Sequence, residues 1–147
     1  YPLDGILNWN RIYGKRGFTQ YQCVIPLEHS EQGLQELLHA ISSSGLGSFL
    51  AVLKLFGKQE GLLSFPIEGY TLALDFPVSA SSLSLLSRLD TIVKKHMGRL
   101  YLTKDVRMPS KFFDETYKGS VERFRQLRTQ FDPEQKINSL QSKRLGL

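Results

Sequence analysis

The sequence predicts an α+β fold in which one antiparallel sheet is built in split β-α-β-β-α-β order, as in ferredoxin-like domains. Two patterns predict it. Apolar residues recur at the i, i+3, i+4, i+7 spacing of amphipathic helices over residues 34–41 and again over 85–97. Apolar and polar residues alternate over 70–76, which is typical of a strand with one face in the core. A chain of 147 residues is long enough to bury the core of one such domain.

The first half of the chain supplies the first helix between two strands. Residues 20–25 are expected to form the first strand, which Pro26 closes. Ser30 is the expected N-cap of the first helix, and residues 42–45 are expected to end it. The second strand is expected over 48–56, and its nearly continuous apolar character predicts a central place in the sheet.

The second half begins with the third strand, at 70–76, and then the second helix. Residues 79–82 are expected to begin that helix and Gly98 to stop it. The fourth strand is expected over 99–103.

The character of the sequence changes beyond Lys104. Pro109-Ser110 and Gly119-Ser120 are each expected to begin a short helix. Residues 131–147 are polar with few apolar anchors, so we expect this tail to pack on a neighbour or to stay mobile.

Composition excludes several classes of protein. Hydrophobic residues make up 41% of the chain and charged residues 22%, which is ordinary for a globular domain. The single cysteine, Cys23, excludes an intrachain disulfide framework and a multi-cysteine zinc site. No apolar run is long enough to span a membrane, and the start at Tyr1 has no signal-peptide pattern. We expect a piece of a longer protein, cytoplasmic or membrane-associated, with no targeting or transmembrane segment of its own.

Charge is unevenly distributed along the chain. Residues 1–75 carry a net charge of −2 and residues 76–147 a net charge of +7. A basic half is typical of proteins with an anionic partner, although a solvated basic surface explains the same count.

The common catalytic and metal-binding signatures do not occur. His29, His39 and His96 are too far apart to form a spaced metal-ligand set, and we expect no metal site. There is no nucleophile elbow and no phosphate-binding glycine loop. Cys23 on a strand is more often a small buried apolar residue than a nucleophile.

Polar side chains instead interrupt the apolar strands. They are Gln20 and Gln22 on the first strand, Lys54 on the second, Thr71 and Asp75 on the third, and Tyr101 and Lys104 at the end of the fourth. If their faces coincide, they form the floor of a pocket for a polar ligand. A sheet with one solvated face is the simpler explanation of the pattern alone. Lys54 fits it least well, because a lysine in an apolar strand must find a partner or reach water.

Six blocks of sequence recur in the same order in a known family. They are residues 9–14, 17–22, 49–57, 63–67 with 69–71, 74–77 and 98–105. Through these blocks the chain resembles the C-terminal portion of the decaprenylphosphoryl-β-D-ribose oxidase group of FAD-linked oxidases, which are of the vanillyl-alcohol oxidase type. The resemblance runs from about Trp9 to the end of the chain.

The resemblance implies a division of labour between two domains. Residues 1–104 would be part of a substrate-binding domain, and residues 105–147 a helical segment that packs back on an N-terminal flavin domain absent from this chain. That flavin domain would bind FAD, which accepts a hydride from an alcohol carbon of a sugar-like, lipid-linked substrate. The substrate would bring the protein to a membrane surface, no nucleic acid would bind, and this fragment alone would be inactive.

The resemblance also implies roles for individual residues. Lys104 and Tyr101 match residues that meet the substrate beside the flavin, where a lysine stabilises negative charge on the reacting oxygen. The matching pocket-lining positions are Gln20, Gln22, Lys54, Phe56 and Thr71. Some relatives carry an asparagine and a cysteine at the positions of Thr71 and Ala73, so the pocket shape differs here.

Two other hypotheses remain open. A split β-α-β-β-α-β sheet also serves as a non-enzymatic binding module for RNA or for an acidic protein, although the RNA-binding sequence signature is absent. A purely structural domain is the third.

Overall fold

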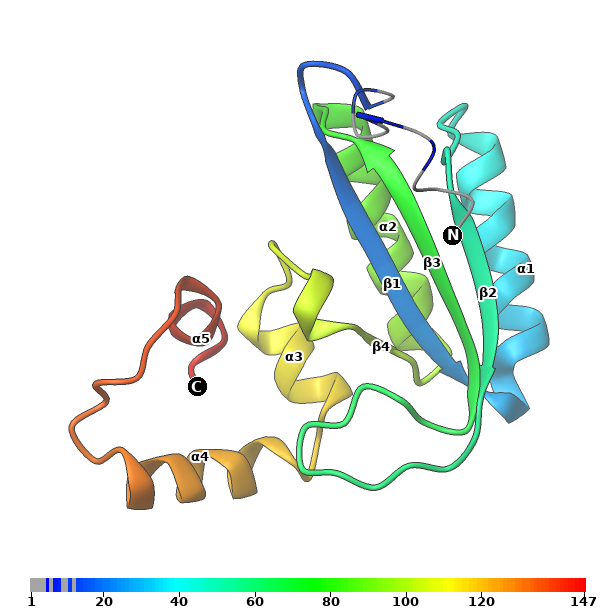
Figure 1. Ribbon diagram of the computed structural model, residues 1–147. Helices are drawn as coiled ribbons and strands as arrows, with labels where there is room; N and C mark the ends of the chain where they lie inside the picture. The colour runs from blue at the N-terminus through cyan, green and yellow to red at the C-terminus, as the bar shows by residue number, and fades with distance from the viewer. Residues whose placement is uncertain (1–4, 6, 9–10, 12) are drawn as a thin grey trace.

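The computed structural model describes residues 5, 7–8, 11 and 13–147, and within them it confirms the α+β fold and the split strand order. The strands are β1 (Phe18–Pro26), β2 (Ala51–Phe56), β3 (Gly69–Pro77) and β4 (Arg99–Leu100). They pair antiparallel in the order β2-β3-β1-β4 (Figure 1). Trp9, Asn10 and Ile12, which belong to the first of the six blocks, lie outside the described residues.

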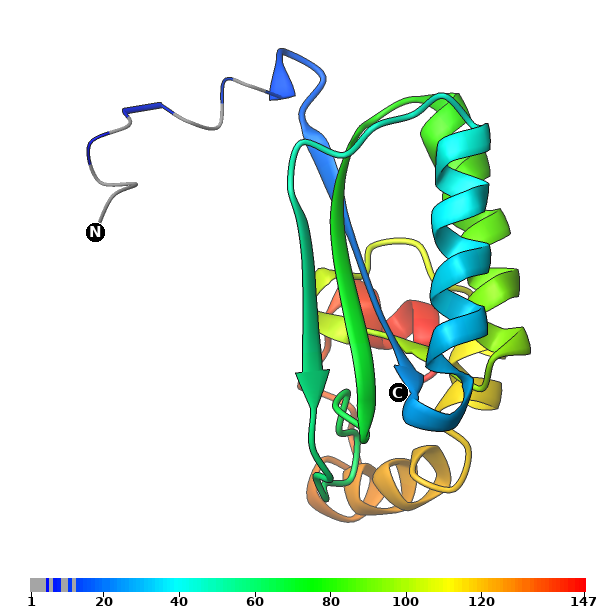
Figure 2. The same ribbon diagram turned by 90° about the vertical axis from the view of Figure 1, so that its right-hand side faces the viewer.

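The two long helices, α1 (Leu27–Ser43) and α2 (Ala80–Lys95), lie on the same face of the sheet (Figure 2). They cover β1, β3 and β4, and the core lies between the two layers. Cys23, Leu72 and Leu89 are among its fully or nearly fully buried members. Burial of this apolar surface is the main stabilising contribution to the fold.

The register of the central pair sets the composition of the other face. Gln20 pairs with Asp75 and Gln22 with Ala73 across β1 and β3, and Lys54 of β2 pairs with Thr71. Residues directly opposite one another share a face of an antiparallel sheet. We call the side away from α1 and α2 the polar face; it carries Gln20, Gln22, Lys54, Phe56, Thr71 and Asp75.

The expectation that the second strand is central is wrong. β2 lies at the edge of the sheet, and Leu53 and Leu55 on its helix side are 55% and 60% exposed. An unbroken apolar run has the same sequence pattern whether or not a helix covers the strand. Here α1 packs mainly on β1 and β3 and leaves β2 largely uncovered.

The first helix also begins earlier than expected. Its N-cap is Pro26 and not Ser30, so the chain passes from β1 into α1 without a loop. Proline fixes a backbone angle that suits the boundary of a helix and has no amide to leave unpaired. The Ser30 hydroxyl, inside the helix, contacts the carbonyls of Ile25 and Pro26 at 2.9 and 2.8 Å. The second helix begins as expected, with a capping box between Ser79 and Ser82.

The fourth strand is shorter than expected. After Leu100 only the Tyr101 amide continues the ladder, donating to the Gln22 carbonyl at 2.9 Å. The chain then turns into a 3-10 helix, η3 (Leu102–Lys104).

The C-terminal helices are α3 (Ser110–Thr116), α4 (Val121–Phe131) and α5 (Leu140–Leu145). The expected starts near Ser110 and Ser120 are confirmed. Within the tail, α5 packs on the chain itself: it returns beside the turn after β4 and buries Leu145 in the core (Figure 2), while residues 133–140 are exposed. In the part of the chain that the structure describes, no helix is both long and apolar enough to cross a bilayer.

Two leucines of α2 test the position of the core. Leu89 is fully buried and Leu83, on the same helix, is 42% exposed. We expect Leu89→Ala to lower the free energy of unfolding by about 2–5 kcal/mol, through lost burial and the cavity left behind, and Leu83→Ala by less than about 1 kcal/mol. Urea unfolding followed by circular dichroism measures both. Equal losses in the two variants would contradict the placement of the core.

Candidate functional site

The polar face brings together the amides and hydroxyl that the sequence pattern singled out. Gln20 Nε2 donates to Asp75 Oδ1 at 2.9 Å, and Gln22 Nε2 donates to Thr71 Oγ1 at 3.1 Å. Both bonds cross from β1 to β3, so the register of these strands holds the two glutamines side by side. The glutamines are half-buried, with part of each side chain open to solvent.

Thr71 and Asp75 lie beneath the glutamines. They are 1% and 3% exposed, and the Thr71 hydroxyl donates to the Cys23 carbonyl at 2.8 Å. Thr71 is therefore a support of the site in this structure and not an exposed lining residue.

Asp75 also accepts a hydrogen bond from the phenol of Tyr13, at 2.5 Å. That bond, with burial and the negative charge of Asp75, raises the pKa of Tyr13 to about 12. Neither Tyr13 nor this role of Asp75 was predicted, since a pairing over 62 residues leaves no local signal in the sequence.

Lys54 and Phe56 lie on the same face but toward its edge. β2 is the edge strand, so Lys54 is exposed and its ammonium group is hydrated by water. Phe56 begins a row of three aromatic rings that runs from the β2 edge of the sheet toward its β4 edge. The Phe65 ring meets Phe56 edge-on at 6.0 Å and stacks on Tyr101 at 4.6 Å between centroids. Phe65 was not predicted as a site residue.

Tyr101 and Lys104 lie next to the glutamines. Gln20, Gln22, Tyr101 and Lys104 all line one small depression of about 10 Å³, which is room for about one water molecule. Gln22 and Lys104 are therefore neighbours at this depression, which lies between β1 and the turn after β4 and is also lined by Tyr21 and Arg107. Lys54, Phe56 and Thr71 do not line this depression.

The turn that carries Lys104 is fixed by the carboxylate of Asp105. This carboxylate is buried, and one of its oxygens accepts the backbone amides of Arg107 and Met108 at 3.1 and 2.8 Å. A carboxylate that accepts two amides of the following residues closes a tight turn.

The C-terminal helix holds the same turn from outside. Arg144 donates to Asp105 Oδ2 at 2.9 Å and to the Met108 carbonyl at 2.8 Å. Gln141 donates to the carbonyls of Leu102 and Asp105 at 2.5 and 3.1 Å. The position of Lys104 thus depends on residues about forty positions further along the chain.

A second ion pair ties this region to α2. Arg107 binds Asp90 through two parallel hydrogen bonds of 2.7 Å each, in the fork geometry that makes arginine–carboxylate pairs specific. Its guanidinium also lies 5.9 Å from the centre of the Tyr21 ring. The segment after Lys104 is therefore anchored to both α2 and α5.

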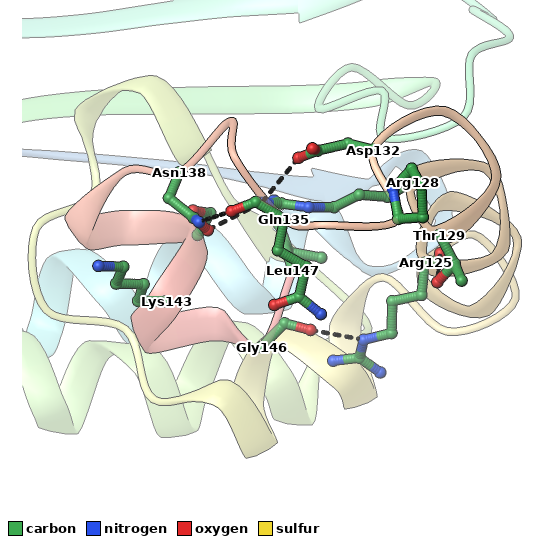
Figure 3. A pocket seen from close by; sticks show the side chains of 11 residues that line it. Arg125, Arg128, Thr129, Asp132, Gln135, Asn138, Lys143, Gly146 and Leu147 are labelled. Carbon is green, nitrogen blue, oxygen red and sulfur yellow. Dashed lines mark hydrogen bonds and ion pairs between the residues drawn. The ribbon is translucent and has the colours of Figure 1, made fainter.

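A larger cavity, of about 520 Å³, lies between α4 and α5 (Figure 3). Its arginines already bind the chain itself. Arg125 Nε donates to the Gly146 carbonyl at 2.9 Å, and Arg128 donates to the carbonyl of Ile137 and to Asn138 Oδ1. This cavity contains none of the predicted site residues, and its two arginines hold the tail.

The remaining reactive side chains are less suited to chemistry. Burial raises the pKa of the Cys23 thiol to about 12, so the nucleophilic thiolate is scarce at neutral pH. His96 is buried, with Nε2 3.2 Å from Glu36 Oε1 on the helix side of the sheet. Within the described residues, no group of three or more histidine, cysteine, aspartate or glutamate side chains could hold a metal ion.

Comparison with known proteins agrees with the resemblance noted in the sequence. No protein-family model matches the chain. It is 38% identical over 148 positions to the decaprenylphosphoryl-β-D-ribose oxidase of Mycolicibacterium smegmatis, covering 100% of this chain and 32% of the oxidase. It is 34% identical over 145 positions to an uncharacterized Streptomyces coelicolor protein from the mprA 5′ region, covering 97% of the chain and 39% of that protein. The resemblance to this oxidase group is confirmed, and the chain spans about a third of the length of these curated relatives.

The bond between Tyr13 and Asp75 predicts an unusual titration. Tyr13 should ionise near pH 12, and its bond should stabilise the fold below pH 10 and cease to do so as the pH rises from 10 toward 12. In Asp75→Asn the Tyr13 pKa should fall toward the ordinary value of about 10. The ring-carbon NMR shift of ¹³C-labelled tyrosine, assigned with Tyr13→Phe, measures it. A Tyr13 pKa near 10 in the parent protein would contradict the geometry.

The contact of α5 with the Lys104 turn predicts a local effect of Arg144. Replacement by glutamine leaves the buried Asp105 carboxylate without its cation, so we expect amide hydrogen exchange to accelerate at Lys104–Met108. Lys143→Gln, an exposed position on the same helix, is the matched control. If the two variants exchange alike over this segment, α5 does not hold the turn.

Proposed function

We propose that this chain is the substrate-binding portion of an FAD-dependent oxidoreductase that removes a hydride from an alcohol carbon of a sugar-like substrate. The observation that carries the proposal is the convergence of Gln20, Gln22, Tyr101 and Lys104 on one depression. Identity of 38% to an oxidase over the whole chain supports the reaction class. The alternation of polar residues is then the lining of a pocket wall and not only a solvated face.

The flavin belongs on a part of the protein that precedes this chain. The chain spans about a third of the oxidase that it matches, which leaves room for a flavin-binding domain in the rest. FAD, when bound, supplies the acceptor for the hydride. The chain has no glycine-rich phosphate loop, but the depression offers the Lys104 cation beside the amides of Gln20 and Gln22, which suits a wall opposite the flavin ring.

Lys104 is the residue that we propose acts on the reacting oxygen. Its ammonium group makes no ion pair within the described part of the chain, so its positive charge is available to a ligand. The hydroxyl would give its proton to solvent water and the carbinol carbon its hydride to the bound flavin; negative charge would develop on oxygen meanwhile, and a positioned cation stabilises such a charge. Tyr101, stacked on Phe65, forms the adjoining side wall.

Lys54 and Phe56 suit the remainder of a lipid-linked substrate. The related oxidase is named for decaprenylphosphoryl-β-D-ribose, a sugar joined to a lipid through phosphate. We propose a substrate of the same class, with the exposed Lys54 ammonium near the phosphate and Phe56 near apolar groups. Such a substrate would bring the enzyme to a membrane surface.

An RNA-binding module is less well supported. RNA-binding sheets of this topology stack bases on aromatic side chains of the central strands. The middle of β1 and β3 presents amides, a hydroxyl and a carboxylate on the polar face instead. These groups form two hydrogen-bonded pairs, Gln20 with Asp75 and Gln22 with Thr71. A face of this kind favours a ligand with hydroxyl groups over a stacked base.

Replacement of Lys104 tests the proposal in the complete, flavin-loaded protein. We expect Lys104→Met to slow reduction of the flavin by a prenylphosphoryl-β-D-ribose by about 10²–10³-fold, since one preorganised charge at a developing oxyanion is lost. Flavin content should be unchanged. Lys118→Met, at an exposed position on a different turn, is the control and should react normally.

Anaerobic stopped-flow bleaching of the flavin absorbance measures this rate. Normal reduction in Lys104→Met would contradict the assigned role. Absence of flavin from the complete protein would contradict the reaction class itself. The 147-residue chain alone should be colourless. A flavin bound to it would contradict the assignment of FAD binding to a separate domain.

A further inference from the structure

The hydrogen bonds beneath Gln22 settle which way its amide faces. The Thr71 hydroxyl has one proton, and it donates that proton to the Cys23 carbonyl at 2.8 Å. Toward Gln22, at 3.1 Å, the Thr71 oxygen can therefore only accept. The Gln22 amino group must face Thr71, and its carbonyl oxygen must point to another side.

The same logic applies to Gln20 with a different partner. A carboxylate only accepts hydrogen bonds, so Asp75 Oδ1 at 2.9 Å requires the amino group of Gln20. The other carboxylate oxygen is occupied by the Tyr13 phenol. Asp75 is 3% exposed and keeps both partners in place.

Both side-chain carbonyl oxygens are consequently left over. Within the described residues neither oxygen accepts a hydrogen bond, and neither is among the buried side-chain atoms that lack one. The two oxygens are thus in contact with solvent, and they belong to side chains that line the depression together with Tyr101 and Lys104.

We infer that Thr71 and Asp75 are positioning residues that make this wall a double hydrogen-bond acceptor. A ligand must then present two donors to it, which sugar hydroxyl groups do and carbonyl or carboxylate groups do not. The lysine ammoniums provide the complementary donors for the reacting oxygen and for an anionic group. The inference deepens the proposed function and rests on it for the identity of the ligand, but the amide orientation does not depend on it.

The orientation is tested without any reaction. In the complete protein with ¹⁵N-labelled glutamine, the Gln22 amino protons should exchange slowly with water and show contacts with the Thr71 methyl group. Thr71→Val, which keeps the shape and removes the hydroxyl, should speed this exchange about tenfold, and Thr71→Ser should retain the slow exchange. Gln20, bonded to Asp75, is the internal control and should not change. Equal exchange in Thr71→Val and the parent protein would overturn the inference.

The acceptor role is tested with ribosides that each lack one hydroxyl. We expect Thr71→Val to raise KM for a short-chain prenylphosphoryl-β-D-ribose about tenfold, with a smaller change in kcat, and Thr71→Ser to restore it. For one deoxy analogue KM should not change in Thr71→Val, because this analogue lacks the hydroxyl group that donates a hydrogen bond to Gln22.

The outcomes separate the two hypotheses. Equal losses with every analogue would overturn the acceptor role, since a general disturbance of the fold acts on all of them. If no riboside reduces the flavin of the parent protein, the proposed function fails. Exchange of the Gln22 amino protons still determines the amide orientation in that case.

Discussion

The pairing register of β1 with β3 is the constraint on which the rest of the structure depends. Tyr21, Cys23 and Ile25 lie in the core, and the residues between them are therefore forced to the opposite face. A slip by one residue would exchange the two faces and put glutamines beneath the helices. Packing of apolar side chains on one side thus fixes the hydrogen-bonding groups on the other, and the stability of the core and the geometry of the candidate site are consequences of one register.

Lys104 is placed by a different constraint, closure of the chain over a long distance. The strand that leads to it ends after Leu100, and the turn that follows is shaped by Asp105 and held by Arg144 of α5. The candidate site therefore joins a rigid sheet to a turn that the C-terminal helix supports. Such a division suits a site in which the binding wall must be fixed while the reacting cation has to be presented from an edge.

Local sequence patterns were sufficient to predict the fold. The prediction was wrong where contacts between distant residues determine the structure. Alternation over 70–76, the capping serine at Ser79 and the order of elements were sufficient for the topology. The edge position of β2 was not predictable, because an apolar strand reads alike whether or not a helix covers it. The proximity of Gln22 to Lys104 was expected, whereas the contacts of Tyr13, Phe65 and Arg144 join residues that are distant in the sequence. No periodicity records such contacts.

The most direct test of the central claim is a structure of the complete protein with flavin and a non-reacting prenylphosphoryl riboside bound. We expect the sugar over the polar face, with its hydroxyl groups within hydrogen-bond distance of the carbonyl oxygens of Gln20 and Gln22 and its reacting oxygen near Lys104 Nζ. A sugar bound on the helix side of the sheet, or in the cavity between α4 and α5, would contradict it.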